Sequence, residues 1–146
     1  MKNSRGFSLL ELLIVVAIIL IIATIAIPSL LRSRQAANES SAVANTRTIN
    51  TAEVTYLSSA GGNYGDITGL VAAGLIDSRF TNGGPVSGYS FTITASGADY
   101  TVEALPTSTN SGRFGYYSVP DAVVRYHDVV TNCSPCFPTT SGAPVQ

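Results

Sequence analysis

The stretch Gly6-Phe7-Ser8-Leu9-Leu10-Glu11-Leu12-Leu13-Ile14-Val15-Val16 places one carboxylate in an otherwise apolar run close to the start of the chain. From Leu9 to Ile27 only Glu11 and Thr24 interrupt a series of Leu, Ile, Val and Ala residues. A helix of this length and composition can span a bilayer, which takes about 20 apolar residues. The sequence therefore predicts a membrane-spanning helix with a single acid near its beginning.

A polar and basic hexapeptide, Met1-Lys2-Asn3-Ser4-Arg5-Gly6, comes directly before this run. Cytoplasmic flanks of export and anchor segments carry such an excess of Lys and Arg. Arg32 and Arg34 lie just beyond the other end of the run and partly cancel that bias. The charge bias is therefore small, but it favours an N-terminus that begins in the cytoplasm.

A cleavable signal peptide is the alternative explanation of the apolar run, with Thr24-Ile25-Ala26 as a small-residue cleavage site. The apolar core of a signal peptide has about 7 to 15 residues and usually lacks acids. The run observed here is longer and contains Glu11, which disfavours this alternative.

The length and net charge of the chain limit the number of domains and the kinds of partner that can be expected. The chain has 146 residues, enough for one compact domain with an appendage. It carries 8 Lys and Arg against 9 Asp and Glu, a net charge of -1. Because this balance gives no excess of basic side chains, the composition predicts no nucleic-acid partner.

Leader, cut site, acid and apolar segment follow one another in a fixed order at the start of the chain. A short basic leader ends in Gly6, Phe7 follows, and Glu11 is the fifth residue of the remaining chain, within the long apolar run. In this order the N-terminus resembles the prepilin signature of type IV pilins and pseudopilins. Pro28 also matches, because members of that family commonly carry a proline at this distance from the cut.

The resemblance implies a processing event and an assembly pathway. Prepilin peptidase cuts family members on the cytoplasmic side, which implies leader cleavage between Gly6 and Phe7 and N-methylation of Phe7. The cut chain then waits in the inner membrane until pilus assembly machinery builds it into a helical filament of identical subunits. Pro28 is the expected position of a helix kink or of local melting during assembly.

Two explanations of Glu11 follow from its chemistry. Ser8-Leu9-Leu10-Glu11 has the spacing of a helix capping box, in which the acid serves only the helix start. Alternatively, cleavage turns the amide nitrogen of Phe7 into an amine with a pKa of about 8. That cation can pair with Glu11 of a neighbouring chain, where either charge alone would be costly to bury. The resemblance favours the intermolecular pair.

The segment from Ser29 to Ser58 contains no Gly or Pro and continues the helix. Ala42, Asn45, Ile49, Ala52 and Tyr56 recur at helical spacing and predict a mildly apolar face that can lie on a sheet. Joined to the membrane segment, this helix would have about 50 residues and a length of roughly 75 Å. A helix of that length needs partners outside its own head domain.

The remainder predicts a small α+β head. Gly61-Gly62-Asn63-Tyr64-Gly65 ends the helix, and Leu70 to Ile76 suggests a short helical turn. Strict alternation predicts two hairpins, which together make a four-stranded antiparallel sheet on the C-terminal half of the long helix. The predicted strands are Tyr89–Ala95, Tyr100–Ala104, Phe114–Val119 and Ala122–Tyr126. The resemblance implies the same architecture, the pilin fold.

These elements divide the chain into five expected regions. Residues 1–6 are the leader peptide, removed on processing, and residues 7–29 are the transmembrane and filament-core helix. Residues 30–60 are an amphipathic helix, residues 61–132 are the globular α+β head, and residues 133–146 are a tail containing Cys and Pro.

Two cysteines, Cys133 and Cys136, lie in that tail. An exported head meets an oxidising compartment, so a disulfide that closes a short loop is the expected state. A redox motif would need a βαβ context, and a zinc site would need two more ligands, for which His127 and Asp128 are the nearest candidates. Pilins often carry a C-terminal disulfide, although it usually encloses a longer loop than this one.

Catalytic and metal-binding patterns are weak in this sequence. His127 is the single histidine, which leaves little for acid–base chemistry. Major pseudopilins hold calcium in their heads as a class, but the head acids here lack calcium-loop spacing. Those acids are Asp66, Asp77, Asp99, Asp121 and Asp128. We therefore expect no enzyme, no cofactor and no metal. The glycosylation tripeptides at residues 38–40 and 132–134 are frequent chance matches, so no sugar is assigned.

The sequence thus predicts a structural subunit of a type IV pilus, located first in the inner membrane and then in an extracellular surface filament. Its expected partners are other copies of itself, prepilin peptidase and the assembly machinery. Two alternatives stay open, a pseudopilin of a type II secretion system and a membrane-tethered binding module that does not polymerise. Whether such a filament serves motility, adhesion, DNA uptake or conduction does not follow from the sequence.

Overall fold

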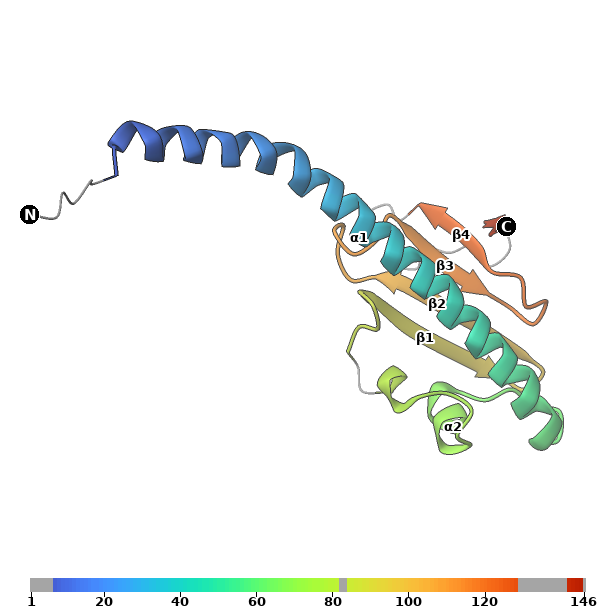
Figure 1. Ribbon diagram of the computed structural model, residues 1–146. Helices are drawn as coiled ribbons and strands as arrows, with labels where there is room; N and C mark the ends of the chain where they lie inside the picture. Colours follow the sequence, from blue (N-terminus) through green and yellow to red (C-terminus); the bar gives the residue numbers. More distant parts are fainter. Residues whose placement is uncertain (1–6, 82–83, 129–141, 146) are drawn as a thin grey trace, which may run out of the picture. The chain divides into compact units, whose positions relative to one another are not determined.

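The computed structural model describes residues 7–81, 84–128 and 142–145. The chain divides into two compact units, Met1–Arg34 and Gln35–Gln146. The long helix α1 (Leu9–Ser59) contributes to both, and the remaining elements belong to the second unit (Figure 1).

The first unit consists of the apolar part of α1. Among the described residues, α1 is the one helix long and apolar enough to cross a membrane. Its most apolar window of 18 residues has a mean hydropathy of 3.1, and none of that window is buried. Pro28 lies inside α1, so it does not end the helix. A helix long and apolar enough to span a membrane is therefore present where the sequence predicted it, with its side chains exposed.

The second unit packs the rest of α1 on an antiparallel sheet, as Figure 1 shows. The five strands lie side by side in the sheet in the order in which they occur along the chain, from β1 to β5. The strands are β1 (Tyr89–Ser96), β2 (Asp99–Pro106), β3 (Phe114–Ser118), β4 (Arg125–Asp128) and β5 (Ala143–Pro144). The predicted α+β fold with a long helix on an antiparallel sheet is confirmed, and the sheet has one short strand more than the four expected.

The core lies between this part of α1 and the inner face of the sheet. The predicted helix face is confirmed, since Ala42, Ile49 and Ala52 are buried with Asn45, while Tyr56 is half-buried. Large side chains from the first two strands fill the space opposite, above all Tyr89, Ile93, Tyr100 and Val102. Because apolar side chains close this interface, the head has a core of its own.

Two short helices connect α1 to the sheet. Helix α2 (Ile67–Ala72) begins earlier than the predicted turn because the Asp66 side chain accepts the Gly69 N–H at 2.7 Å and caps it. The 3₁₀ helix η1 (Ser78–Phe80) is capped in the same way by Asp77, which accepts the Arg79 N–H at 2.8 Å. The sequence did not predict η1.

The last two strands differ from the prediction in position. Strand β4 begins at Arg125 rather than Ala122, because Ala122 takes a left-handed φ of 57° and Asp121 accepts the Val123 N–H, which together make residues 119–123 a turn. Strand β5 pairs Ala143 with Tyr126 along the edge of β4. The N–H of Val145 extends this pairing to the Val124 oxygen at 2.8 Å. A strand of two residues carries too little alternation to be predicted.

Candidate functional site

The start of α1 holds the acid that the sequence singled out. Ser8 is the residue before the helix, and its backbone N–H donates to Glu11 Oε2 at 2.9 Å. The Leu12 N–H closes the first turn on the Ser8 oxygen at 3.2 Å. This is one half of a capping box, so Glu11 does cap the start of its own helix. Phe7 precedes it and is 82% exposed, while Gly6 lies outside the described residues.

Capping engages only part of the Glu11 carboxylate. Only one oxygen of its carboxylate accepts a hydrogen bond within the described residues, and the side chain is exposed. The helix dipole favours a negative charge in this first turn. Glu11 is therefore held toward the helix start, beside the residue whose nitrogen would become cationic after a cut.

Large apolar side chains surround Glu11 on every side of the helix. Leu9 is 82% exposed and Leu30 is 70% exposed at the two ends of this surface. Exposed apolar patches of such extent mark contacts with protein or membrane. The apolar surface consists of Phe7, Leu9, Leu10, Leu12, Leu13, Ile14, Val15, Val16, Ile18, Ile19, Leu20, Ile21, Ile22, Ile25, Ile27, Leu30 and Leu31.

Polar side chains within this segment bond to their own helix. The Thr24 hydroxyl donates to the Ile21 oxygen at 2.7 Å, and the Ser33 hydroxyl donates to the Ser29 oxygen at 3.0 Å. Pro28 has no N–H, which leaves the Thr24 carbonyl without its usual donor. The segment thus presents a nearly uninterrupted apolar surface.

A second set of polar residues fastens α1 to the loop between β2 and β3. We call it the helix–loop lock; it comprises Gln35, Asn38 and Glu39 on α1 and Thr109, Ser111 and Arg113 on the loop. Arg113 donates to Glu39 from its backbone N at 2.8 Å, from Nε at 3.1 Å and from Nη2 at 3.0 Å. Gln35 Nε2 donates to the Thr109 oxygen at 2.7 Å, and Asn38 Nδ2 donates to the Ser111 oxygen at 2.9 Å.

The lock is placed at the first turn of α1 that belongs to the head. Glu39 is only 7% exposed, so its charge depends on the donors of Arg113. Glu39 in turn raises the pKa of the Arg113 guanidinium, chiefly through the side-chain hydrogen bonds. The Asn38 amide is also engaged here, which gives the Asn38-Glu39-Ser40 tripeptide a structural role.

Glu53 is a second buried acid on the same helix. Its side chain is fully buried, Oε2 accepts the Gly65 N–H at 3.0 Å, and Oε1 has no hydrogen-bond partner among the described residues. Burial raises the pKa of Glu53, the Gly65 hydrogen bond lowers it, and the nearby Asp66 raises it again. The loop approaches closely, because a Cβ on Gly65 would lie 3.0 Å from the Tyr56 ring.

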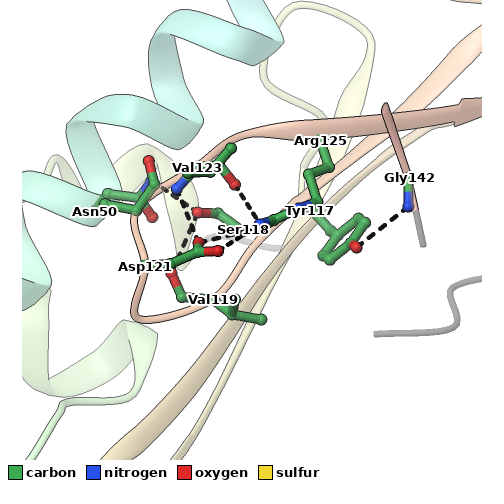
Figure 2. A network of polar contacts seen from close by, with 9 residues as sticks. Asn50, Tyr117, Ser118, Val119, Asp121, Val123, Arg125 and Gly142 are labelled. Carbon is green, nitrogen blue, oxygen red and sulfur yellow. Dashed lines mark hydrogen bonds and ion pairs between the residues drawn. The ribbon is translucent and has the colours of Figure 1, made fainter. Parts of the chain in front are cut away.

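Asn50 joins α1 to the turn between β3 and β4, as Figure 2 shows. Its amide nitrogen donates to Ser118 Oγ at 2.9 Å and to the Ala122 oxygen at 3.3 Å. Its amide oxygen accepts from the Tyr100 hydroxyl at 3.1 Å. An exposed ion pair between Asp121 and Arg125 lies beside it in the same view.

Sequence reasoning missed Glu39, Asn50 and Glu53 as structural residues. Glu39, Ala42, Thr46, Ile49 and Glu53 are spaced by three and four residues, so the pattern that predicted the helix face continues through both acids. The acids were not assigned to that face because Glu is rarely buried unless it is paired. The signal was therefore present, but their partners are distant in sequence.

The remaining predicted residues fall into two groups. Cys133 and Cys136 lie outside the described residues. His127 and Asp128 are exposed at the end of β4, with His127 Nδ1 2.9 Å from the Asp128 oxygen. In the part of the chain that the structure describes, no three His, Cys, Asp or Glu side chains gather into a possible metal site.

Comparisons with known proteins agree with the geometry of the N-terminus. Residues 1–27 match the family described as the prokaryotic N-terminal methylation motif. The chain is 56% identical over 39 residues to the type IV wide pilus major component PilA4 of Thermus thermophilus. It is 43% identical over 56 residues to the type IV major pilin protein PilA of Myxococcus xanthus.

These matches cover only part of each chain. They span 27% of this chain and 30% of the Thermus protein, and 38% of this chain and 26% of the Myxococcus protein. The chain thus matches less than a third of the length of either relative. The chain thus carries the prokaryotic N-terminal methylation motif at residues 1–27 and is similar, over part of its length, to two type IV pilus subunits.

Proposed function

We propose that this chain is the major structural subunit of a type IV pilus, polymerised into a helical surface filament of identical subunits. The observation that carries the proposal is the apolar surface from Phe7 to Leu31, of which the structure buries nothing in the window that could cross a membrane. Burying one large apolar side chain contributes about 1.5–3 kcal/mol. Such a surface needs lipid before assembly and neighbouring subunits after it.

The processing steps form part of the same proposal. Residues 1–6 are removed by prepilin peptidase at Gly6 and Phe7, and Phe7 is then N-methylated. Residues 7–29 cross the inner membrane and later form the filament core, residues 30–60 connect to the head, and residues 61–132 form the head on the filament surface. The match of residues 1–27 to the methylation motif supports this division at its N-terminal end.

Glu11 provides the register between subunits in this proposal. The amine created on Phe7 is cationic at neutral pH, since its pKa is about 8. In a dry helix bundle, pairing with Glu11 of an adjacent subunit satisfies both charges at one axial offset. The exposed carboxylate, bonded through one oxygen to Ser8, supports this role, because the other oxygen is available to a partner.

The two alternatives make different use of the same helix. A pseudopilin would assemble into a short periplasmic piston, and a tethered binding module would not assemble at all. The names of both relatives, a pilus component and a major pilin, favour the pilus subunit. Pro28 as a kink or melting point, the Cys133–Cys136 disulfide and the assembly machinery as partner remain proposals within this reading.

Lysine usage in the chain provides a sharp test of processing. Lys2 is the only lysine, so the uncut chain has two primary amines, on Met1 and on Lys2. After the cut the single amine is that of Phe7, and methylation removes its primary character. We expect filament subunits not to react with a reagent selective for primary amines, whereas the precursor reacts at both amines.

The decisive experiment joins this readout to microscopy. Sheared surface material is imaged by electron microscopy, and its subunit is identified by mass and by amine reactivity. Long filaments of a chain that begins with methylated Phe7 are the expected result. A surface protein that retains Met1 and forms no filaments would instead support the tethered module, and short periplasmic assemblies would support the pseudopilin.

A further inference from the structure

Charges on α1 are sorted by sign between its inner and outer surface. Beyond Glu11 the helix has two acids, Glu39 and Glu53, and both are buried and accept a backbone N–H of the head. The arginines of the helix are all exposed, and none forms an ion pair within the described residues. These arginines are Arg32, Arg34 and Arg47. The outward surface of α1 beyond its first turn is therefore basic.

Arg32 and Arg34 stand where they hinder membrane insertion. They follow the apolar run, on the side that crosses the membrane when the N-terminus stays in the cytoplasm. Positive charge close to a membrane segment favours the cytoplasmic side, so these two residues oppose the bias of Lys2 and Arg5. Membrane insertion therefore does not explain these two arginines.

The head carries acids that match them. Asp66 and Asp77 cap short helices, and Asp121 pairs with Arg125. Three acids have neither a hydrogen bond nor an ion pair at the side chain within residues 7–81, 84–128 and 142–145. They are Asp99 at the β1–β2 turn, Glu103 on β2 and Asp128 at the end of β4.

The head has no comparable supply of open cations. Arg79 donates from Nη2 to Asn45 Oδ1 at 3.3 Å, and its guanidinium lies 5.1 Å from the centre of the Phe80 ring. Arg113 and Arg125 are in ion pairs. Arg47 lines a groove with Tyr116 and Val145 on its own head, so we place the contact at Arg32 and Arg34.

We propose that Arg32 and Arg34 of one subunit, which point to different sides of α1, each bind an open head carboxylate of a neighbouring copy of this chain, drawn from Asp99, Glu103 and Asp128. The inference rests on the polymerisation proposed above and adds a second charge contact to that of Glu11. Removal of Lys2 and Arg5 changes the net charge from 8 − 9 = -1 to 6 − 9 = -3. Identical acidic subunits repel each other, and cations placed against acids of neighbouring heads offset that repulsion.

The test compares filaments of the wild-type chain with filaments of the double variant Arg32→Gln/Arg34→Gln. Ion pairs at exposed positions weaken as salt screens them, with a Debye length of about 10 Å at 0.1 M. Wild-type filaments should shed subunits as salt rises. The double variant should give several-fold fewer filaments at low salt and should not lose filaments as salt rises, because the repulsion between its more acidic subunits is then screened. Its membrane level and Phe7 processing should be no lower than those of the wild type.

Two controls hold the helix surface constant. Arg32→Lys/Arg34→Lys keeps both charges and should retain most of the filament yield. Ser33→Gln changes the size of the exposed residue between them without a charge and should also retain it. If the Lys variant falls as far as the Gln variant, or if the Gln variant assembles with the wild-type salt response, the proposal is wrong.

Charge reversal identifies the partner. Arg32→Glu/Arg34→Glu should not assemble, and one of Asp99→Arg, Glu103→Arg or Asp128→Arg in the same chain should restore filaments. Rescue by none of the three overturns the proposal. A loss of membrane-inserted subunit with normal filaments from the remainder also overturns it, in favour of lipid phosphates as the partner. Absence of filaments from the wild-type chain would refute the proposed function itself, which is a separate outcome.

Discussion

The two parts of α1 place their side chains by opposite rules. Up to Arg34 the helix exposes its apolar residues and bonds its few hydroxyls to its own backbone. From Gln35 onward it buries polar residues, among them Glu39 and Glu53, and each of these two acids accepts a backbone N–H of the head. Among the described residues, the first part therefore leaves its apolar side chains uncovered, while the second part packs against the head of the same chain.

Two glutamates express this difference in chemical terms. Glu11 is exposed near an apolar surface that has no partner in the single chain, whereas Glu53 is fully buried in the head. The same substitution, Glu to Gln, removes one charge at either position and changes the shape of the side chain little. The pair of variants thus separates assembly from folding.

The largest effect is expected from Glu11→Gln. Gln can still accept the Ser8 N–H, so the helix start persists and only the charge is lost. We expect filaments to be absent or strongly reduced by electron microscopy of sheared material, with normal subunit in the membrane. Glu53→Gln is the matched control and should assemble. Filaments of Glu11→Gln at the wild-type level would show that capping alone explains this acid.

A smaller but measurable loss of stability is expected from Glu39→Ala. The change removes the acceptor of three Arg113 donors, of which the guanidinium is 61% exposed and can return to water. We expect the free energy of unfolding to fall by about 2 kcal/mol, as for hydrogen bonds to a charged group. Urea unfolding of the detergent-solubilised chain, followed by near-ultraviolet circular dichroism of its tyrosines, measures this.

Glu39→Gln provides the control for that variant. Its amide oxygen can still accept the Arg113 N–H, so about half of the loss should be recovered. An unfolding midpoint of Glu39→Ala equal to the wild-type value would mean that the helix–loop lock adds nothing to the head.

Glu53→Gln should change the pH dependence of stability. Burial raises the folded-state pKa of Glu53 above its ordinary value of 4.5, so the acid contributes stability that is full below pH 4.5 and is lost as pH rises through the folded pKa. Gln cannot ionise, and the variant should keep its stability at neutral pH. We expect the variant to be more stable than the wild type near pH 8, and to differ little from it near pH 4. A loss at both pH values would refute this assignment.

The smallest effect is expected from Asp121→Asn. Its ion pair with Arg125 is exposed, and such pairs contribute roughly 0–1 kcal/mol. Asn can still accept the Val123 N–H that shapes the turn. The urea midpoint should therefore move only slightly, and it should become less sensitive to salt. If the free energy of unfolding fell as much as in Glu39→Ala, this turn would contribute as much to the stability of the head as the helix–loop lock does, which contradicts the prediction.

Local patterns predicted most of the fold because period and alternation are strong in this chain. Helical spacing predicted the helix face from Ala42 to Ala52, and alternation on both sides of Gly97 predicted the first hairpin. In the structure Gly97 has a φ of 61°, which suits a two-residue turn. Strand β5 was not predicted, since it exists only through its pairing with β4. Turn geometry at Ala122 likewise depends on Asp121 and Asn50.

The candidate site was predicted in part for a similar reason. The motif around Phe7 and Glu11 is contiguous, so its residues could be read in order, and the Ser8–Glu11 bond of the capping box is confirmed. Glu39 and Arg113 are separated by 74 positions, and nothing local signals that they meet. Pairs of this kind become visible only once the sheet has brought the β2–β3 loop to the helix.

The helix–loop lock has a mechanical consequence. Among the contacts described for the head, those of Gln35, Asn38 and Glu39 are the ones closest to the N-terminal part of α1. Tension applied along the helix reaches the head first through these bonds. Because they load together and two of them involve a charged guanidinium, they resist shear as a group rather than opening one after another. If a fibre were pulled, force would therefore be transmitted from the helix to the sheet at the turn from Gln35 to Glu39.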